Sequence, residues 1–111
     1  MLVLEFLGCA FLLFMVTSVG TYPVSDGSSH GINIYKLVYV VLIVYVIICA
    51  IGPFTGAHIN PAISLGVFMD FKKRRGKGKV VAAYMVAQFL GGFVGAMLSA
   101  AIYDNGQIVF E

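Results

Sequence analysis

Charged residues are scarce in this sequence, at 11% of 111 residues, whereas hydrophobic residues make up 60%. Soluble domains carry about 25% charged residues, so a soluble fold of this length could not cover its own core with polar side chains. This composition excludes disordered, nucleic-acid-binding and soluble-enzyme classes, and the length allows at most one domain. The sequence therefore predicts an integral membrane protein whose immediate partner is the lipid bilayer of the plasma or another cellular membrane.

Cysteines and metal-ligand clusters are also few. Cys9 and Cys49 both fall inside apolar runs, so we interpret them as small packed side chains and not as a disulfide framework. His58 has no other ligand at metal-binding spacing, so no metal site is expected, and a buried imidazole that supports the backbone is the favoured interpretation. The sequence contains no nucleophile–base pair and no phosphate loop, so we expect neither an enzyme nor a cofactor.

Basic residues are concentrated in one place, since six of the seven Lys and Arg lie within residues 72–79. A run of this kind between two apolar spans indicates a cytoplasmic loop rather than a nucleic-acid-binding segment. The amino terminus is then also cytoplasmic, and the connector 20–36 and the tail 104–111 lie on the opposite side.

Three apolar runs, at about residues 2–19, 37–53 and 80–103, are long enough to span a bilayer. The second run is rich in β-branched residues, which would favour a strand in water, but its length favours a membrane helix. The first run carries Glu5 and has no basic region before it, so a cleaved signal peptide is not expected.

The segment at about 54–69 is uncharged yet irregular at its start. Asn60 is a favoured N-cap and Pro61 a favoured first helical residue, so a helix is predicted to begin there. Its ten residues would extend roughly 15 Å, half of a hydrocarbon core about 30 Å thick. Irregular backbone at membrane depth is tolerated only where it is buried in protein or lines a wet cavity. The segment therefore predicts a re-entrant half-helix, either at a pore or simply buried.

Residues 55–66, which read TGAHINPAISLG, resemble the first signature loop of the aquaporin and glycerol-facilitator (major intrinsic protein) family. Residues 5–8 resemble the first-span motif of that family, and residues 84–95 resemble its third-span motif. The resemblance covers essentially the whole chain but matches only the first of the two inverted halves of family members. It implies an all-α membrane protein in which three transmembrane helices and one re-entrant half-helix form a single half domain over residues 1–111.

The resemblance further implies passive transport of water or of small neutral solutes such as glycerol, which pass only when a complementary inverted half or an oligomeric channel assembly is present. The positive end of the half-helix would repel cations, and the Asn60 amide would donate to a passing oxygen. The pore loop would comprise the Asn-Pro-Ala triplet, Asn60, Pro61 and Ala62, whose first residue supplies the amide. It would also comprise Gly56, Ala57 and His58, whose backbone carbonyls would form a row of acceptors. A truncated fragment of a full-length channel and a non-conducting interaction module remain as alternatives.

Three side chains outside the loop complete the hypothesis. The resemblance assigns Glu5 to support of the loop backbone, against the alternative of a catalytic carboxylate that lacks a partner. Gln88 is expected to form helix-to-loop hydrogen bonds rather than to contact solute. Val40 lies twenty residues before Asn60, a position that contributes to the selectivity constriction in the family. A small aliphatic side chain there favours a wider, less polar passage for water and glycerol, unless Val40 only packs a helix.

The third span carries a small-residue ridge, which comprises Ala87, Gly91, Gly95 and Ser99. Small residues repeated every four positions allow membrane helices to approach closely. The ridge predicts close packing, either inside the half or onto a partner, and we expect it to be available for contact with the second half.

Overall fold

The computed structural model describes residues 1–21, 34–69, 78–104 and 107–108. The connector at 22–33 and most of the basic run, residues 72–77, lie outside the described residues. The described elements are the helices α1 (Leu2–Thr21), α2 (Ile34–Thr55), α3 (Pro61–Met69) and α4 (Gly78–Ile102), and the short antiparallel strands β1 (Tyr103–Asp104) and β2 (Gln107–Ile108).

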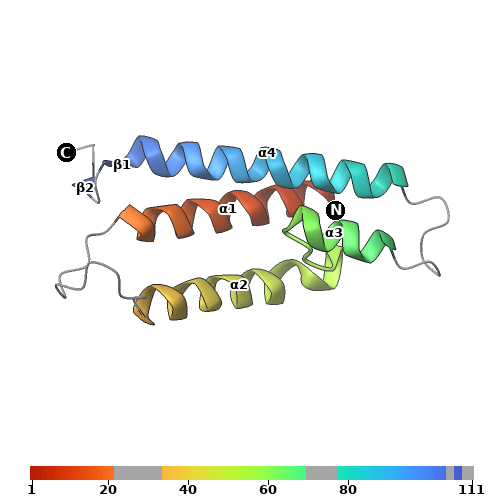
Figure 1. Cartoon of the computed structure of the whole chain (residues 1–111), viewed down its shortest axis with the longest axis horizontal. Helices are drawn as coiled ribbons and strands as arrows, with labels where there is room; N and C mark the ends of the chain where they lie inside the picture. Colours follow the sequence, from red (N-terminus) through yellow and green to blue (C-terminus); the bar gives the residue numbers. More distant parts are fainter. Residues whose placement is uncertain (22–33, 70–77, 105–106, 109–111) are drawn as a thin grey trace.

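Helices α1, α2 and α4 are each long and apolar enough to cross a membrane. They run side by side along the long axis of the molecule, and α3 lies at the end where α1 and α4 begin (Figure 1). The nine residues of α3 extend roughly 14 Å, less than half of a bilayer. The predicted all-α membrane fold, with three spanning helices and one half-helix, is confirmed.

The bounds of the second span differ from the prediction, because α2 begins three residues earlier and continues through Pro53 to Thr55. Proline usually ends a helix because it lacks an N–H donor. Here the last turn still closes, since the Gly56 N–H donates to the Gly52 carbonyl at 2.9 Å. The Thr55 hydroxyl also donates back to the carbonyl of Ile51 at 3.3 Å. The two-residue strands were not predicted, because segments this short carry no readable periodicity.

Helices α1 and α4 are packed backbone to backbone. A Cβ atom at Gly91 would overlap the carbonyl oxygen of Phe6, and one at Gly95 would overlap the carbonyl oxygen of Ala10. Only glycine allows the two helices to approach this closely, which is the use of small residues expected in membrane helices.

A hydroxyl pair continues the same contact toward the carboxyl ends of the two helices. Ser99 and Ser18 are both buried, and their hydroxyl oxygens lie 3.1 Å apart. Ser18 also donates to the carbonyl of Phe14 at 2.6 Å, so Ser99 is the donor between the two hydroxyls. The small-residue ridge is therefore used inside the half. The expectation that it remains available to a partner is wrong, apart from the half-exposed Ala87.

Helix α2 is only lightly covered by the rest of the chain. Of its 22 residues only Ile47 and Thr55 are buried. A small apolar core forms where α1, α2 and the segment before α3 meet, around Cys9, Ile47 and Ile59. Ile43 and Ile51 pack partly against this core, while many other apolar side chains of α2 are exposed, as expected of a helix that contacts lipid or another protein.

Candidate functional site

The loop between α2 and α3 has an unusual backbone. Gly56 has a φ of 84°, Ala57 of 46° and Ile59 of 38°. Glycine adopts such left-handed conformations readily, whereas a β-branched residue does so only as an outlier. Each strained non-glycine residue costs about 1–3 kcal/mol and persists only when its surroundings hold it in place. The loop must therefore be held by contacts from other elements.

The Glu5 carboxylate on α1 supplies those contacts. Its Oε1 accepts a hydrogen bond from the His58 N–H at 3.1 Å, and its Oε2 accepts one from the Ile59 N–H at 2.8 Å. Glu5 is 0% exposed, so both bonds lie away from water. This is the contact that the loop-support hypothesis requires of Glu5.

Gln88 on α4 and Ser64 on α3 complete a buried polar cluster with Glu5. The Gln88 Nε2 donates to the Glu5 Oε2 at 2.8 Å and to the Ser64 Oγ at 2.9 Å. Gln88 therefore reaches the loop indirectly, through Glu5 and through Ser64 of α3, and no hydrogen bond from its side chain to the loop backbone is seen among the described residues. Sequence reasoning missed Ser64, although it is the only polar side chain within Pro61–Met69.

His58 lies at the edge of this cluster. Its Nδ1 is 3.0 Å from the Ser64 Oγ, and its ring is tilted against that of Tyr84, with 5.4 Å between centroids. The residue is half-exposed, so the prediction of a buried imidazole is wrong in part. The polar contact on its inner side is consistent with a supporting role.

Asn60 begins α3 as predicted. Its Oδ1 accepts from the Ala62 N–H at 2.9 Å, and its carbonyl accepts from the Ser64 N–H at 3.0 Å. Asn60 is exposed, and its Nδ2 has no hydrogen-bond partner among the described residues. The cap thus uses the amide oxygen and leaves both amide hydrogens free to donate to another molecule.

The loop also offers acceptors. The carbonyl oxygens of Gly56, Ala57 and His58 accept no hydrogen bond from any described residue. Unpaired carbonyls at membrane depth need water, solute or another chain as a partner. The loop therefore presents acceptors close to the free amide donors of Asn60.

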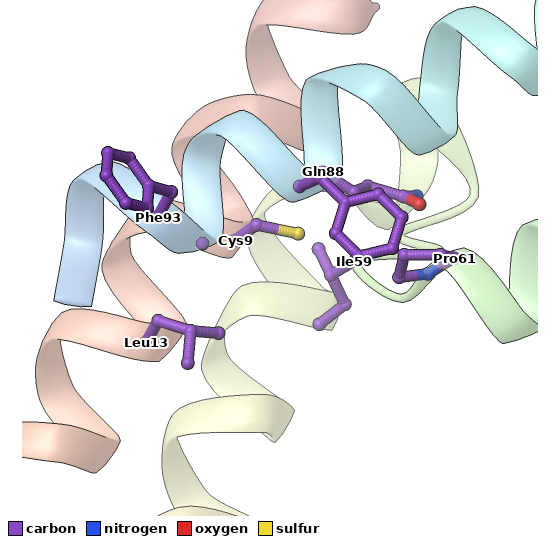
Figure 2. A pocket seen from close by; sticks show the side chains of 8 residues that line it. Cys9, Leu13, Ile59, Pro61, Gln88 and Phe93 are labelled. Atoms are coloured by element: carbon purple, nitrogen blue, oxygen red, sulfur yellow. The ribbon is translucent and has the colours of Figure 1, made fainter.

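A nearly apolar groove is bordered by α1, α4 and the segment at the start of α3 (Figure 2). Its lining comes from α1, from the segment around the start of α3 and from α4: Cys9, Leu13, Ile59, Pro61, Gln88, Phe89, Gly92 and Phe93. The sulfur of Cys9 points toward Ile59, as a packed side chain would. Both cysteines are free thiols, but Cys49 is exposed on α2, so the expectation that it is packed is wrong.

Comparison with known proteins decides the family. The sequence model of the major intrinsic protein family matches residues 1–110. The chain belongs to the major intrinsic protein family. This confirms the resemblance that the signature loop and the two span motifs predicted.

Curated relatives of this major intrinsic protein chain include solute facilitators and aquaporins. The glycerol uptake facilitator protein of Haemophilus influenzae is 36% identical, over 96% of this chain and 39% of the relative. The corresponding protein of Pseudomonas aeruginosa is 32% identical, over 96% of this chain and 37% of the relative. Human aquaporin-9 is 33% identical, over 97% of this chain and 33% of the relative. The chain thus spans less than two fifths of the length of these relatives, and no solved structure matches it significantly.

Val40 lies apart from the polar cluster in this major intrinsic protein chain. It is half-exposed on α2 and lines neither the cluster nor the groove of Figure 2. Its part in a selectivity constriction stays a prediction.

Proposed function

We propose that residues 1–111 form one half domain of a channel for passive transport of water and small neutral solutes such as glycerol. The observation that carries the proposal is the Asn60 amide, which is exposed at the start of α3 while its oxygen caps that helix. An N-cap that needed only to start the helix could be serine or aspartate. Asparagine adds two free donors at the same place.

The donors and acceptors together suit a neutral hydroxyl compound. Water or glycerol can accept from the Asn60 amide and donate to the free carbonyls of residues 56–58, which replaces the hydrogen bonds it leaves in bulk water. A cation meets the positive end of α3 and is repelled. The small side chain of Val40 favours glycerol as well as water, and the names of the glycerol uptake facilitators support the same choice.

One half supplies only one wall of such a channel. The sequence contains one signature loop, and in this structure the exposed side of that loop faces no other part of the described chain. We infer that a complementary inverted half, on the same polypeptide or on another, covers Asn60 and completes the passage. Two identical copies in opposite orientations are disfavoured, because the basic run 72–79 fixes one orientation with a cytoplasmic amino terminus.

Vesicle permeability tests this proposal. The chain is reconstituted alone and together with the part of the Haemophilus influenzae facilitator that lies beyond the match, and shrinkage is followed by stopped-flow light scattering. We expect water and glycerol permeability to rise only in the mixture. Asn60→Asp should abolish the rise, because aspartate keeps the cap but removes both donors. Gly66→Ala is the matched control on α3, since a Cβ there meets no atom within 4 Å.

Two results would contradict the proposal. Permeability that depends on Asn60 in vesicles of the chain alone would favour an antiparallel pair of identical halves. A stable mixed complex that conducts neither solute would favour a non-conducting interaction module.

A further inference from the structure

Gly8 on α1 is in close contact with the side chain of Ile59 in the loop. A Cβ atom at Gly8 would lie 2.9 Å from the Ile59 Cγ2 and 2.9 Å from the Ile51 Cδ1. Among the described glycines, only Gly8 would bring a Cβ within 3.0 Å of a loop side chain. Glycine is less favourable than alanine inside a helix, so a buried glycine at this point of α1 calls for a reason, and the space that it leaves for Ile59 supplies one.

Ile59 cannot easily give way to a larger side chain at Gly8. A β-branched side chain is stiff at χ1, and Ile59 is also packed in the apolar core with Cys9 and Ile47. Its Cγ2 is bonded to Cβ, so it moves only with χ1 or with the backbone, whereas the Cδ1 of Ile51 is the free end of a side chain. Carbon atoms in contact normally lie about 3.5–4.0 Å apart, so a Cβ at Gly8 would displace Ile59 by about 0.5–1 Å.

This displacement acts on the hydrogen bond between the loop and Glu5. Glu5 and Gly8 are three residues apart, so they lie on the same face of α1. The Ile59 N–H donates to the Glu5 Oε2 at 2.8 Å. Movement of Ile59 away from that face by about 0.5 Å would lengthen the distance beyond the usual 2.7–3.2 Å. Glu5 thus holds the backbone of Ile59 while Gly8 admits its side chain, and together they set the distance between the loop and α1.

The peptide group between His58 and Ile59 carries the displacement to the exposed side of the loop. Its N–H and its carbonyl are held in one plane and point in opposite directions, so the His58 carbonyl points away from α1 and moves with Ile59. Asn60 is exposed and follows Ile59 directly in the chain. We propose that Gly8 is a positioning residue that sets how far the His58 carbonyl and the Asn60 amide project on the exposed side of the loop.

The consequence for transport rests on the proposed function, in which these two groups line the passage. One methyl group added at Gly8 pushes them away from α1 and narrows the passage. Glycerol is larger than water, so its permeability should fall more than that of water. The position of the loop itself does not depend on the proposed function.

Hydrogen exchange tests the position of Ile59 without any transport. In the full chain in lipid nanodiscs, Gly8→Ala should speed exchange of the Ile59 amide about tenfold, as expected from loss of one buried hydrogen bond. The amides of α4 should keep the parent rate, whereas a general loss of stability would speed them as well. An unchanged rate for Ile59, or an equal increase along α4, would overturn the proposal.

Two second-site variants separate the loop contact from the contact with α2. Ile59→Leu removes the methyl group at Cγ2, so Gly8→Ala combined with Ile59→Leu should show the same exchange at position 59 as Ile59→Leu alone. Ile51→Val removes the Cδ1 instead and is the matched control, which should not restore the rate. Absence of rescue by Ile59→Leu, or rescue by Ile51→Val, would overturn the proposal. If Gly8→Ala fails to fold, the yield of folded chain is scored for the same variants by the same criteria.

Permeability tests the consequence for the passage. In the mixed vesicles described above, Gly8→Ala should lower the ratio of glycerol to water permeability, and addition of Ile59→Leu should restore it. An unchanged ratio in a conducting mixture would overturn the effect on the passage. If the mixture conducts neither solute, the proposed function fails, and the exchange rates still decide the role of Gly8.

Discussion

Replacement of Glu5 by alanine examines how much one carboxylate contributes to the loop. Glu5 accepts hydrogen bonds from the N–H groups of His58 and Ile59 and from the Gln88 amide. Each buried donor left without a partner costs about 1–3 kcal/mol, so three give about 3–9 kcal/mol if nothing moves. Relaxation of the left-handed Ala57 and Ile59 would recover about 1–3 kcal/mol each. We therefore expect a net loss of about 2 kcal/mol together with loss of the loop conformation.

Hydrogen exchange of the loop amides measures this loss directly. In lipid nanodiscs, the His58 and Ile59 amides of Glu5→Ala should exchange on the order of 30-fold faster than in the parent, which corresponds to about 2 kcal/mol. Glu5→Gln keeps one acceptor oxygen and should fall between the two. Ser99→Ala is the matched control, because it removes a buried hydrogen bond to Ser18 at the other end of α1 and should leave the loop amides unchanged.

The reasoning is refuted if His58 and Ile59 exchange at the parent rate in Glu5→Ala. The left-handed backbone would then be stable without the carboxylate, and some other contact would have to hold it.

Two further predictions concern packing and orientation. Gly91→Ala should lower the free energy of unfolding by more than about 3 kcal/mol, because its Cβ overlaps backbone that cannot move aside. Gly66→Ala, whose Cβ has open space, should be close to neutral. Thermal unfolding in detergent compares the two variants, and equal midpoints would contradict the backbone contact. Single cysteines are introduced at Ser28 and at Gly76 in a background without the native cysteines. They should react with a membrane-impermeant reagent from opposite faces of the membrane. Labelling of both from one face would contradict the predicted topology.

Much of the fold could be predicted from the sequence because the bilayer constrains it so strongly. The length of an apolar run fixes whether a helix can span, and the start of α3 is marked by Asn60 and Pro61, whose preferences are local. The contacts of Glu5 were predictable for a different reason, since its carboxylate stands alone in an apolar span and must find buried donors. The family resemblance supplied which donors these are.

Other features depend on which way a helix faces, and periodicity does not show this for a helix that is apolar all round. The ridge on α4 could serve α1 or a partner equally well until the contacts of Gly91 and Gly95 with α1 were seen. Ser64 carries no distinctive motif of its own, and its importance arises only from two neighbours outside α3, His58 and Gln88. Cys49 is exposed because α2 is covered on one side only. The sequence of α2 does not show which side this is, because the helix is apolar on both sides.

The exposed side of the loop at residues 56–60 makes the stability of the folded chain depend on what binds there. Asn60 and Gly56 are exposed, and polar groups of this kind placed in hydrocarbon without partners cost several kcal/mol. Any molecule that binds this side of the folded chain stabilises it by mass action, in proportion to its concentration and affinity. If a complementary half covers this side, as proposed, a copy without that half is the less stable species. In that case the supply of the complementary half would set the fraction of this chain that stays folded.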